Sequence, residues 1–371
     1  MNEYLTIKGG VLVKCSKDAS GSIIIPDSVT SIGGDAFRCC SSLESIVIPD
    51  GVTSIGTWAF RSCTSLKSIV IPDGVTSIGE GAFAYCSSLE SIVIPESVTA
   101  IGYEAFRGCT SLKSIVIPDS VTSIGDFAFC GCSSLKSIVV SPGNAVYDSR
   151  ANCNGIIETA TNKLLIGCGS TVIPDSVTSI GDKAFYCCKS LKSIVIPESV
   201  TSIGDAFSFC KSLESIVILD GVTEIGKYAF CGCFSLDSIV IPDSVTSIGK
   251  SAFSGCSSLK CIVIPDSVTS IGKSAFYGCS SLESIVIPDG VTLIGYKAFR
   301  DCTSLKSIVI PDSVTSIGYK AFNSCSSLES IVVSPGNAVY DSRDNCNAII
   351  ETSTNRLIAK CRSTVLPDGI S

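Results

Sequence analysis

The sequence contains no histidine in 371 residues. A Ser-His-Asp or Cys-His catalytic constellation is therefore excluded, because histidine supplies the general base in both. Zinc is disfavoured as well, since no two of the 22 cysteines have C-x-x-C spacing and no histidine is present to complete a tetrahedral ligand set. The sequence predicts a protein that is not an enzyme, with no cofactor and no metal.

Charge and long apolar runs are also scarce. Only 16% of the residues are charged, and 34 acidic against 27 basic side chains give a net charge of −7 without a block of Lys or Arg. A nucleic-acid partner is therefore not expected. No uninterrupted apolar run approaches the roughly 18 residues needed to span a bilayer, so membrane insertion is not expected either. The first residues, MNEYLTIKGG, lack the basic and apolar regions of a secretory signal, which indicates a cytosolic protein or a leader already removed.

A 23-residue repeat dominates the chain. Its clearest copy is Leu112–Cys132, LKSIVIPDSVTSIGDFAFCGC, and its proline returns in most copies, at Pro26, Pro49, Pro72, Pro95, Pro118, Pro174, Pro197, Pro242, Pro265, Pro288 and Pro311. A fixed period of this length indicates a solenoid, in which each coil buries its apolar side by stacking on its neighbours.

One coil can be interpreted residue by residue. The β-branched run before Pro118 predicts a strand that the proline ends, because proline has no N–H to donate. A tight turn follows, then a short extended piece closed by Gly125, and then a short helical or irregular corner that turns Ala128, Phe129 and Cys132 inward. We predict a mainly β fold with short helical turns.

The repeat also predicts the organisation of the chain. A passage beginning SPGNAVYDSR interrupts the period twice, and its apolar runs flanking a polar turn predict a β-hairpin. The predicted segments are an N-terminal hairpin cap (1–22), five coils (23–140), a hairpin insertion continuous with the solenoid (141–171), seven coils (172–333), and a second insertion with a truncated coil (334–371).

The coil pattern L-x-x-I-x-I-P-x-x-V-x-x-I-G-x-x-A-F-x-x-C resembles the BspA-like class of leucine-rich repeats, as does the insertion NAVYDSRxNCNxIIET. The resemblance implies a curved leucine-rich-repeat solenoid. It also implies a surface-exposed or secreted protein of a host-associated microbe that binds host matrix proteins or other cells, and a role in virulence.

Cysteine follows the repeat in a column predicted to hold buried free thiols that fill space as small apolar groups. The hairpins hold two further pairs, Cys153 with Cys168 and Cys346 with Cys361. If Glu158 pairs with Lys163, each pair lies across its hairpin and is a candidate disulfide, although a slip of one residue would separate the two thiols. The column consists of Cys40, Cys63, Cys86, Cys109, Cys132, Cys188, Cys210, Cys233, Cys256, Cys279, Cys302 and Cys325.

Sequence variation between coils is concentrated after the glycine and after the phenylalanine, where large aromatics recur. They are candidate anchors for a protein partner, since Tyr and Trp carry much of the energy of interfaces; an unconstrained surface explains them equally well. These residues are Trp58, Tyr85, Tyr103, Phe127, Tyr186, Phe209, Tyr228, Phe234, Tyr277, Tyr296 and Tyr319. A stripe of outward valines, including Val70, Val116 and Val286, is an alternative contact surface.

We therefore expect a non-catalytic solenoid that binds proteins, with adhesion to host matrix or cells as the first hypothesis and an intracellular scaffold as the alternative. A column of threonines, including Thr76, Thr122 and Thr269, leaves an ice-ordering surface as a remote third. The acidic residues after the prolines, such as Asp119, have a solvated turn as their simplest interpretation and a cation site as the other.

Overall fold

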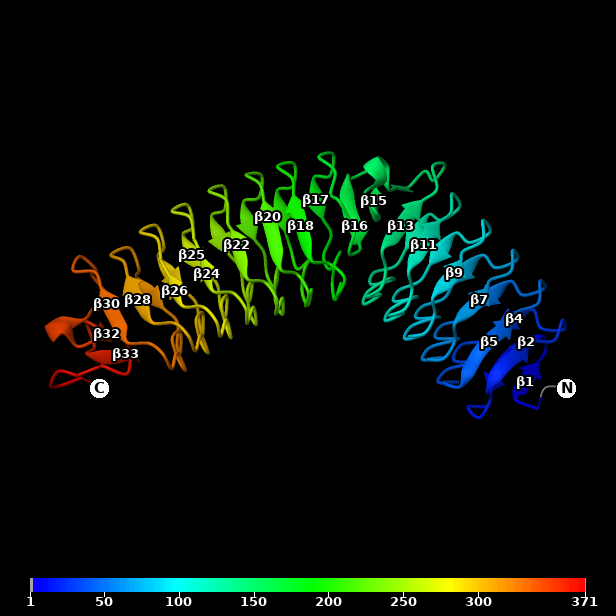
Figure 1. Cartoon of the computed structure of the whole chain (residues 1–371), viewed down its shortest axis with the longest axis horizontal. Coiled ribbons are helices and arrows are strands. Elements are labelled where there is room, and N and C mark those ends of the chain that lie inside the picture. The colour runs from blue at the N-terminus through cyan, green and yellow to red at the C-terminus, as the bar shows by residue number, and fades with distance from the viewer. Residues whose placement is uncertain (1–2, 371) are drawn as a thin grey trace. The chain divides into compact units, whose positions relative to one another are not determined.

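The computed structural model describes residues 3–370 and confirms the predicted fold class. The chain is built from short strands in stacked coils (Figure 1), and the helical elements among the described residues are two single 3₁₀ turns, η1 (Arg150–Asn152) and η2 (Arg343–Asn345). It divides into two compact units. The first comprises the chain up to Pro174 together with Cys187–Ser190, and the second comprises Asp175–Tyr186 and the chain from Leu191 onward.

Each coil of the first unit contributes a main strand before the proline and a short strand before the glycine. Equivalent residues of successive coils are paired in parallel, for example Ile69 with Ile92 and Ile55 with Ile78. The main strands are β3 (Gly21–Ile24), β5 (Leu43–Val47), β7 (Ser68–Val70), β9 (Ser91–Val93), β11 (Ser114–Ile117) and β13 (Ser137–Val140). The short strands are β4 (Ser31–Ile32), β6 (Ser54–Ile55), β8 (Ser77–Ile78), β10 (Ala100–Ile101) and β12 (Ser123–Ile124).

The second unit repeats this arrangement. Its main strands are β18 (Ser193–Ile196), β20 (Ser215–Ile218), β22 (Ser238–Val240), β24 (Cys261–Ile262), β26 (Ser284–Ile285), β28 (Ser307–Ile310) and β30 (Ser330–Val333). Its short strands are β17 (Ser179–Ile180), β19 (Ser202–Ile203), β21 (Glu224–Ile225), β23 (Ser247–Ile248), β25 (Ser270–Ile271), β27 (Leu293–Ile294) and β29 (Ser316–Ile317). The coil that lacks one residue stays in register, because Ser193–Ile196 pairs with Ser215–Ile218 at a spacing of 22 residues.

A hairpin precedes the first coil. β1 (Leu5–Lys8) and β2 (Val11–Cys15) are antiparallel, and the intervening Gly9 and Gly10 have φ angles of 56° and 77°. Such left-handed angles suit a primed hairpin turn and cost glycine little. β2 then pairs in parallel with β4, so the hairpin occupies the edge of the sheet of short strands.

The core of each unit is a set of columns, because every coil places the same side chain at the same height. The phenylalanines stack ring upon ring, with centroids 5.0–5.5 Å apart from Phe37 to Phe129 and 4.9–5.6 Å apart from Phe185 to Phe322. Ten of these rings are less than 2% exposed. Burial of each ring contributes roughly 1.5–3 kcal/mol, which makes this column a major source of stability.

Each insertion forms a small antiparallel sheet. The strands are β14 (Tyr147–Asp148), β15 (Gly155–Glu158) and β16 (Lys163–Gly167) in the first copy, and β31 (Tyr340–Asp341), β32 (Ala348–Glu351) and β33 (Arg356–Lys360) in the second. A buried asparagine holds the first insertion to the preceding coil: Asn144 Nδ2 donates to the carbonyls of Pro118 and Val121, both at 2.8 Å. The equivalent Asn337 donates to Pro311 and Val314.

Candidate functional site

The corner after each glycine is a run of tight turns with left-handed backbone at two repeat positions. Trp58 has a φ of 56° and Tyr85 a φ of 62°, at the second residue after the glycine and after the phenylalanine respectively. Glycine occupies the same positions in other coils, for example Gly81 and Gly108. Because a left-handed turn suits glycine better than a bulky residue, the aromatics are held there by their surroundings.

The following coil supplies the support for these aromatic rings. A Cβ placed on Gly81 would lie 2.3 Å from Trp58 Cδ1, and one on Gly108 would lie 2.8 Å from Tyr85 Cδ1. Both separations are too short for any residue but glycine, so each ring lies directly on the backbone of the next coil. The aromatic edge is therefore organised by pairs of residues one repeat apart.

Arginine side chains alternate with these rings in the first unit. The guanidinium carbon of Arg38 lies 5.6 Å from the Trp58 ring centroid, and that of Arg107 lies 5.7 Å from the Tyr85 centroid. Between the two rings lies Arg61, 5.5 Å from Trp58 and 5.4 Å from Tyr85. We call these five residues the arginine–aromatic ladder; each contact falls within the range of a cation–π interaction.

Further along the first unit, two more aromatics are in contact. Tyr103 meets Phe127 edge to face, with ring centroids 5.7 Å apart. Tyr103 is 43% exposed, whereas Phe127 is half-buried. An exposed phenolic ring on an ordered neighbour is a suitable anchor for a protein partner.

In the second unit the aromatics are more scattered. Tyr186 meets Phe209 edge to face at 5.6 Å, and Tyr296 and Tyr319 have centroids 6.4 Å apart. Several rings also carry a cation, including both members of the last pair. These contacts are Lys250 on Tyr228, Lys211 on Phe234, Arg300 on Tyr277, Lys273 and Lys297 on Tyr296, and Lys320 on Tyr319. Tyr319 is 70% exposed, the most of these aromatics. Within the second unit the predicted partner-binding residues thus lie in several ring–ring and ring–cation groups.

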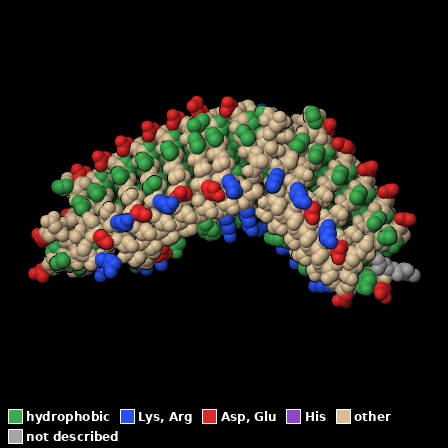
Figure 2. Space-filling view, in the orientation of Figure 1, with side chains coloured by type: hydrophobic (Ala, Val, Ile, Leu, Met, Phe, Trp, Pro, Cys, Tyr) green, Lys and Arg blue, Asp and Glu red, His purple; other side chains and the backbone are tan. Residues whose placement is uncertain are grey.

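The valine stripe lies on the strand face, opposite the core side chains of the main strands. Val70 and Val93 in the first unit and Val263 and Val286 in the second are 72–76% exposed. Figure 2 shows rows of hydrophobic side chains on this visible face, next to a row in which basic and acidic side chains alternate. Among the exposed ion pairs of the chain, Lys67 pairs with Glu44 at 2.9 Å and Lys306 with Glu283 at 2.8 Å. Exposed pairs of this kind contribute little to stability.

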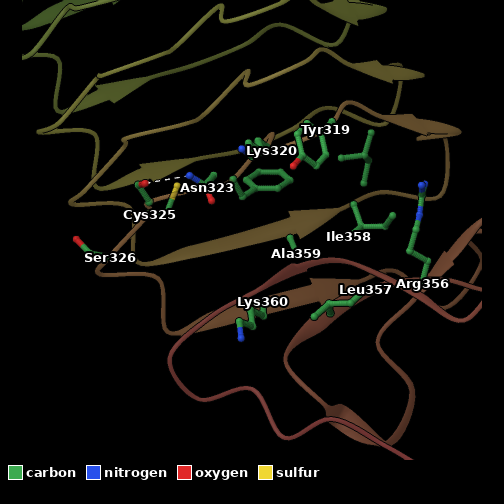
Figure 3. Close-up of a pocket in the computed structure, with 13 residues that line it drawn as sticks. Tyr319, Lys320, Asn323, Cys325, Ser326, Arg356, Leu357, Ile358, Ala359 and Lys360 are labelled. Carbon is green, nitrogen blue, oxygen red and sulfur yellow. Dashed lines mark hydrogen bonds between the residues drawn. The ribbon is translucent and has the colours of Figure 1, made fainter. Parts of the chain in front are cut away.

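A cavity of about 550 Å³ opens at the last regular coil of the second unit (Figure 3). It lies between the corner from Tyr319 to Ser326 and strand β33, with Leu357 and Ala359 on the hairpin side. Cys325 lines it but is buried, and its thiol donates to the carbonyl of Phe299 at 3.1 Å. Lys320, Arg356 and Lys360 supply the charged groups that line it, and Arg356 is paired with Glu351 at 3.5 Å.

The cysteine column is buried and hydrogen-bonded. From Cys63 to Cys132 and from Cys210 to Cys325, each thiol donates to the backbone carbonyl of the phenylalanine in the preceding coil at 3.0–3.2 Å. Burial raises the pKa of Cys132, Cys233, Cys279 and Cys325 to about 12. These thiols are donors as well as fillers, a role that composition and spacing do not reveal.

The hairpin cysteines do not align as expected. Glu158 does pair with Lys163, but a bulge at Leu165 shifts the register so that Ile156 pairs with Ile166. Cys168 is thereby moved one residue from the position opposite Cys153 and donates to the carbonyl of Asn154 at 3.3 Å. The second copy has the same bulge, and Cys361 donates to Asn347 at 3.4 Å. The structure describes Cys153, Cys168, Cys346 and Cys361 as free thiols.

The hydroxyls of the threonine column are engaged within the protein. Threonine hydroxyls donate to the carbonyl of the threonine one coil earlier, as Thr269 does to Thr246 at 3.4 Å, so these hydroxyls are committed to the protein's own backbone. Within residues 3–370 no group of three Cys, Asp or Glu side chains is placed to hold a metal ion. Over the same span no helix is long and apolar enough to cross a bilayer.

Several structural residues escaped the sequence interpretation. Asn144 and Asn337 are buried polar anchors, and Arg150 and Arg343 clamp Asp148 and Asp341 within the insertions. The ladder was missed too, although Arg61 three residues after Trp58 could have signalled it. Contacts between coils join residues 20–26 apart in sequence, which the pattern of one coil does not bring together.

Parallel coils, stacked phenylalanines and a strand on one side of every coil define the class of this protein as a leucine-rich-repeat solenoid. The family model described as BspA type leucine rich repeat region matches residues 14–136, 162–280 and 223–348, and the chain belongs to that family. Proteins of this kind are generally non-catalytic repeat proteins. No curated protein matches this chain.

Solved structures agree. A leucine-rich repeat protein of Bacteroides ovatus is 31% identical with a TM-score of 0.55, over 89% of this chain and 92% of that one. A leucine rich cell surface protein of Faecalibacterium prausnitzii is 33% identical with a TM-score of 0.54, over 85% of this chain and 79% of that one. A leucine-rich repeat protein of Eubacterium ventriosum shares the fold at 24% identity and a TM-score of 0.52, over 79% of this chain and 90% of that one.

Proposed function

We propose that this protein is an adhesion-type binder that holds host matrix proteins, or proteins of other cells, at a cell surface. Its fold is typical of protein-binding solenoids, and a relative with 33% identity is named as a cell surface protein. The observation that carries the proposal is the aromatic edge, where rings such as Trp58 and Tyr85 are fixed on the backbone of the following coil. Ordered rings lose little entropy on binding, which favours their use as interface anchors.

The test is capture of purified, immobilised extracellular-matrix proteins by the full chain. We expect binding to fall strongly when Trp58, Tyr103 and Tyr319 are replaced together by alanine. The matched control replaces Val70, Val263 and Val286 by serine, which alters the strand face and leaves the edge intact. Circular dichroism establishes that both variants are folded.

Each outcome decides something. Loss of capture in the aromatic variant alone supports the edge as the binding site. Loss in the valine variant alone moves the site to the strand face and contradicts the assignment of the edge. If the folded wild type captures no matrix protein and does not attach to host cells, the adhesion function is overturned.

Surface display is tested separately on intact cells of the source organism. We expect an antibody against the chain to label unpermeabilised cells, and external protease to remove the signal. Labelling that requires permeabilisation would favour the intracellular scaffold instead.

A further inference from the structure

Arg61 differs from its two arginine neighbours in the ladder. Arg38 is paired with Asp35 at 3.0 Å and Arg107 is paired with Glu104, in each case an acid three residues earlier in the same coil. The residue three positions before Arg61 is Trp58, so the acid is replaced by a ring. Among residues 3–370, Arg61 has ring contacts but neither an ion pair nor a side-chain hydrogen bond.

The two rings restrict how this guanidinium can be approached. Trp58 and Tyr85 both lie within 5.5 Å of its carbon, and the two rings come from successive coils. A guanidinium presents five N–H donors in its own plane and none above or below it. Arg61 is partly exposed. Because a ring lies on each of two sides of the guanidinium, a ligand reaches it through the edge that carries the N–H groups.

The rings are themselves immobilised. Trp58 lies on Gly81 and Tyr85 lies on Gly108, where even a Cβ would collide with them. The guanidinium is therefore oriented before any ligand arrives, and the rings lower the local dielectric around it. Both effects strengthen a charge-assisted hydrogen bond.

We propose that Arg61, held between Trp58 and Tyr85, binds a single carboxylate of an acidic segment in a partner protein. The planar fork of arginine matches the two oxygens of a carboxylate. The indole and phenol on either side would receive apolar or aromatic residues that flank the acid. This inference rests on the proposed protein-binding function and names the chemistry recognised at one part of the same edge.

The surrounding charge favours one carboxylate over a dense polyanion. Asp35 and Glu104 neutralise the outer arginines, and the whole chain carries a net charge of −7. A run of sulfates would meet these carboxylates on either side of Arg61, whereas one acidic side chain among apolar neighbours would not. An acidic glycan is thus the less favourable ligand.

Trp58 makes the test direct, because it is the only tryptophan in the chain. Its fluorescence is titrated with a blocked peptide that carries one glutamate between two phenylalanines, and with the same peptide carrying glutamine. We expect the glutamate peptide to bind about tenfold more tightly, the order of one charge-assisted bidentate contact. Equal affinity for the two peptides would overturn the proposal.

Variants locate the effect on Arg61. Arg61→Gln should abolish the preference for glutamate, and Arg61→Lys, which keeps the charge but loses the fork, should reduce it severalfold. Arg356→Gln is the matched control, since Arg356 belongs to the second insertion and is paired with Glu351, and it should leave the preference unchanged. If Arg61→Gln binds both peptides as the wild type does, the site lies elsewhere.

Two further measurements separate this proposal from the function on which it rests. If heparin quenches the fluorescence of Trp58 in a way that depends on Arg61, and the glutamate peptide does not, the ligand of the site is an acidic glycan and not an acidic protein segment. If the aromatic triple variant loses matrix capture while Arg61→Gln retains it, adhesion through the edge stands and the carboxylate site fails.

Discussion

The thiol of Cys279 donates a hydrogen bond to the backbone carbonyl of Phe253, with 3.2 Å between the sulfur and the oxygen. The same carbonyl accepts the backbone N–H of Cys256 at 3.1 Å, so one phenylalanine carbonyl joins the cysteines of two successive coils. This contact repeats in both units. It explains how a small side chain can connect coils without a disulfide.

Replacing Cys279 by alanine should lower the free energy of unfolding by about 1–2 kcal/mol, because a buried sulfur and its hydrogen bond are lost. Cys261→Ala is the matched control, since Cys261 is exposed and should change the stability by less than about 0.5 kcal/mol. Urea unfolding followed by circular dichroism measures both. Equal values for the two variants would contradict the role given to the column.

Stability should fall above about pH 9. Burial raises the pKa of Cys132, Cys233 and Cys279 to about 12 in the folded chain, whereas an unfolded thiol loses its proton near pH 8.5. A raised folded-state pKa contributes stability that is complete below the unfolded value and is lost as the pH rises toward the folded one. Each such thiol adds a slope of up to about 1.4 kcal/mol per pH unit.

The measurement is the urea midpoint between pH 8 and pH 11, with reductant present throughout. We expect a steady decline that is shallower in Cys279→Ala. A midpoint that stays constant over this range would show that the column thiols do not titrate with unfolding.

The hairpin cysteines are tested by counting thiols. Their hydrogen bonds to Asn154 and Asn347 and the shifted register lead us to expect that all 22 cysteines react with an alkylating reagent in denaturant without reductant. Mass spectrometry of protein taken from its native compartment gives the number. Four protected cysteines, mapped to Cys153, Cys168, Cys346 and Cys361, would establish the two disulfides instead.

Asn144 should be the most sensitive position of the first insertion. Its amide donates to Pro118 and Val121, and its Oδ1 accepts the N–H groups of Val146 and Tyr147 at 2.9 and 2.8 Å. Alanine removes all four hydrogen bonds in a buried place, and we expect a loss of about 2–4 kcal/mol. Trp58 fluorescence reports the unfolding, because Trp58 belongs to the same unit.

Two variants control this experiment. Asn144→Asp keeps the Oδ1 acceptor and loses the Nδ2 donors, so the free energy of unfolding should fall measurably. Unlike the loss in Asn144→Ala, this loss should depend on pH, because the introduced carboxyl group titrates. Thr57→Ala removes an exposed side chain of the same unit and should be nearly neutral. A neutral Asn144→Ala would mean that the insertion does not depend on this anchor.

The columns could be predicted because a period of 23 residues forces equivalent side chains to meet. Ala128, Phe129 and Cys132 were all expected inside, and each is buried. The pairing of Glu158 with Lys163, which was the condition for the two disulfides, is present, but the bulge at Leu165 removes the alignment of Cys153 with Cys168. No local signal marks that bulge, since apolar residues occupy both sides of it.

The corner of the coil was predicted less well. A short helical turn was one expectation for the segment around Trp58, yet its backbone is left-handed at that residue. Aromatic residues do not favour such a conformation, so local propensity points away from it. The same left-handed angle occurs at this position in other coils, as at Asp35 and Glu104, and at Trp58 the backbone N–H donates to the carbonyl of Glu80 in the following coil at 2.7 Å, a contact that lies outside any single repeat.

The sequence by itself determined the solenoid, its period, its buried columns and the absence of a histidine-based site, because these follow from which residues recur and at what spacing. Only the tertiary structure decided which side chains of neighbouring coils touch. The placement of Arg61 between Trp58 and Tyr85 depends on the rise between coils and on room above two glycines. Both are distances between coils. A repeat pattern gives the order of residues along the chain but not which side chains of neighbouring coils are in contact.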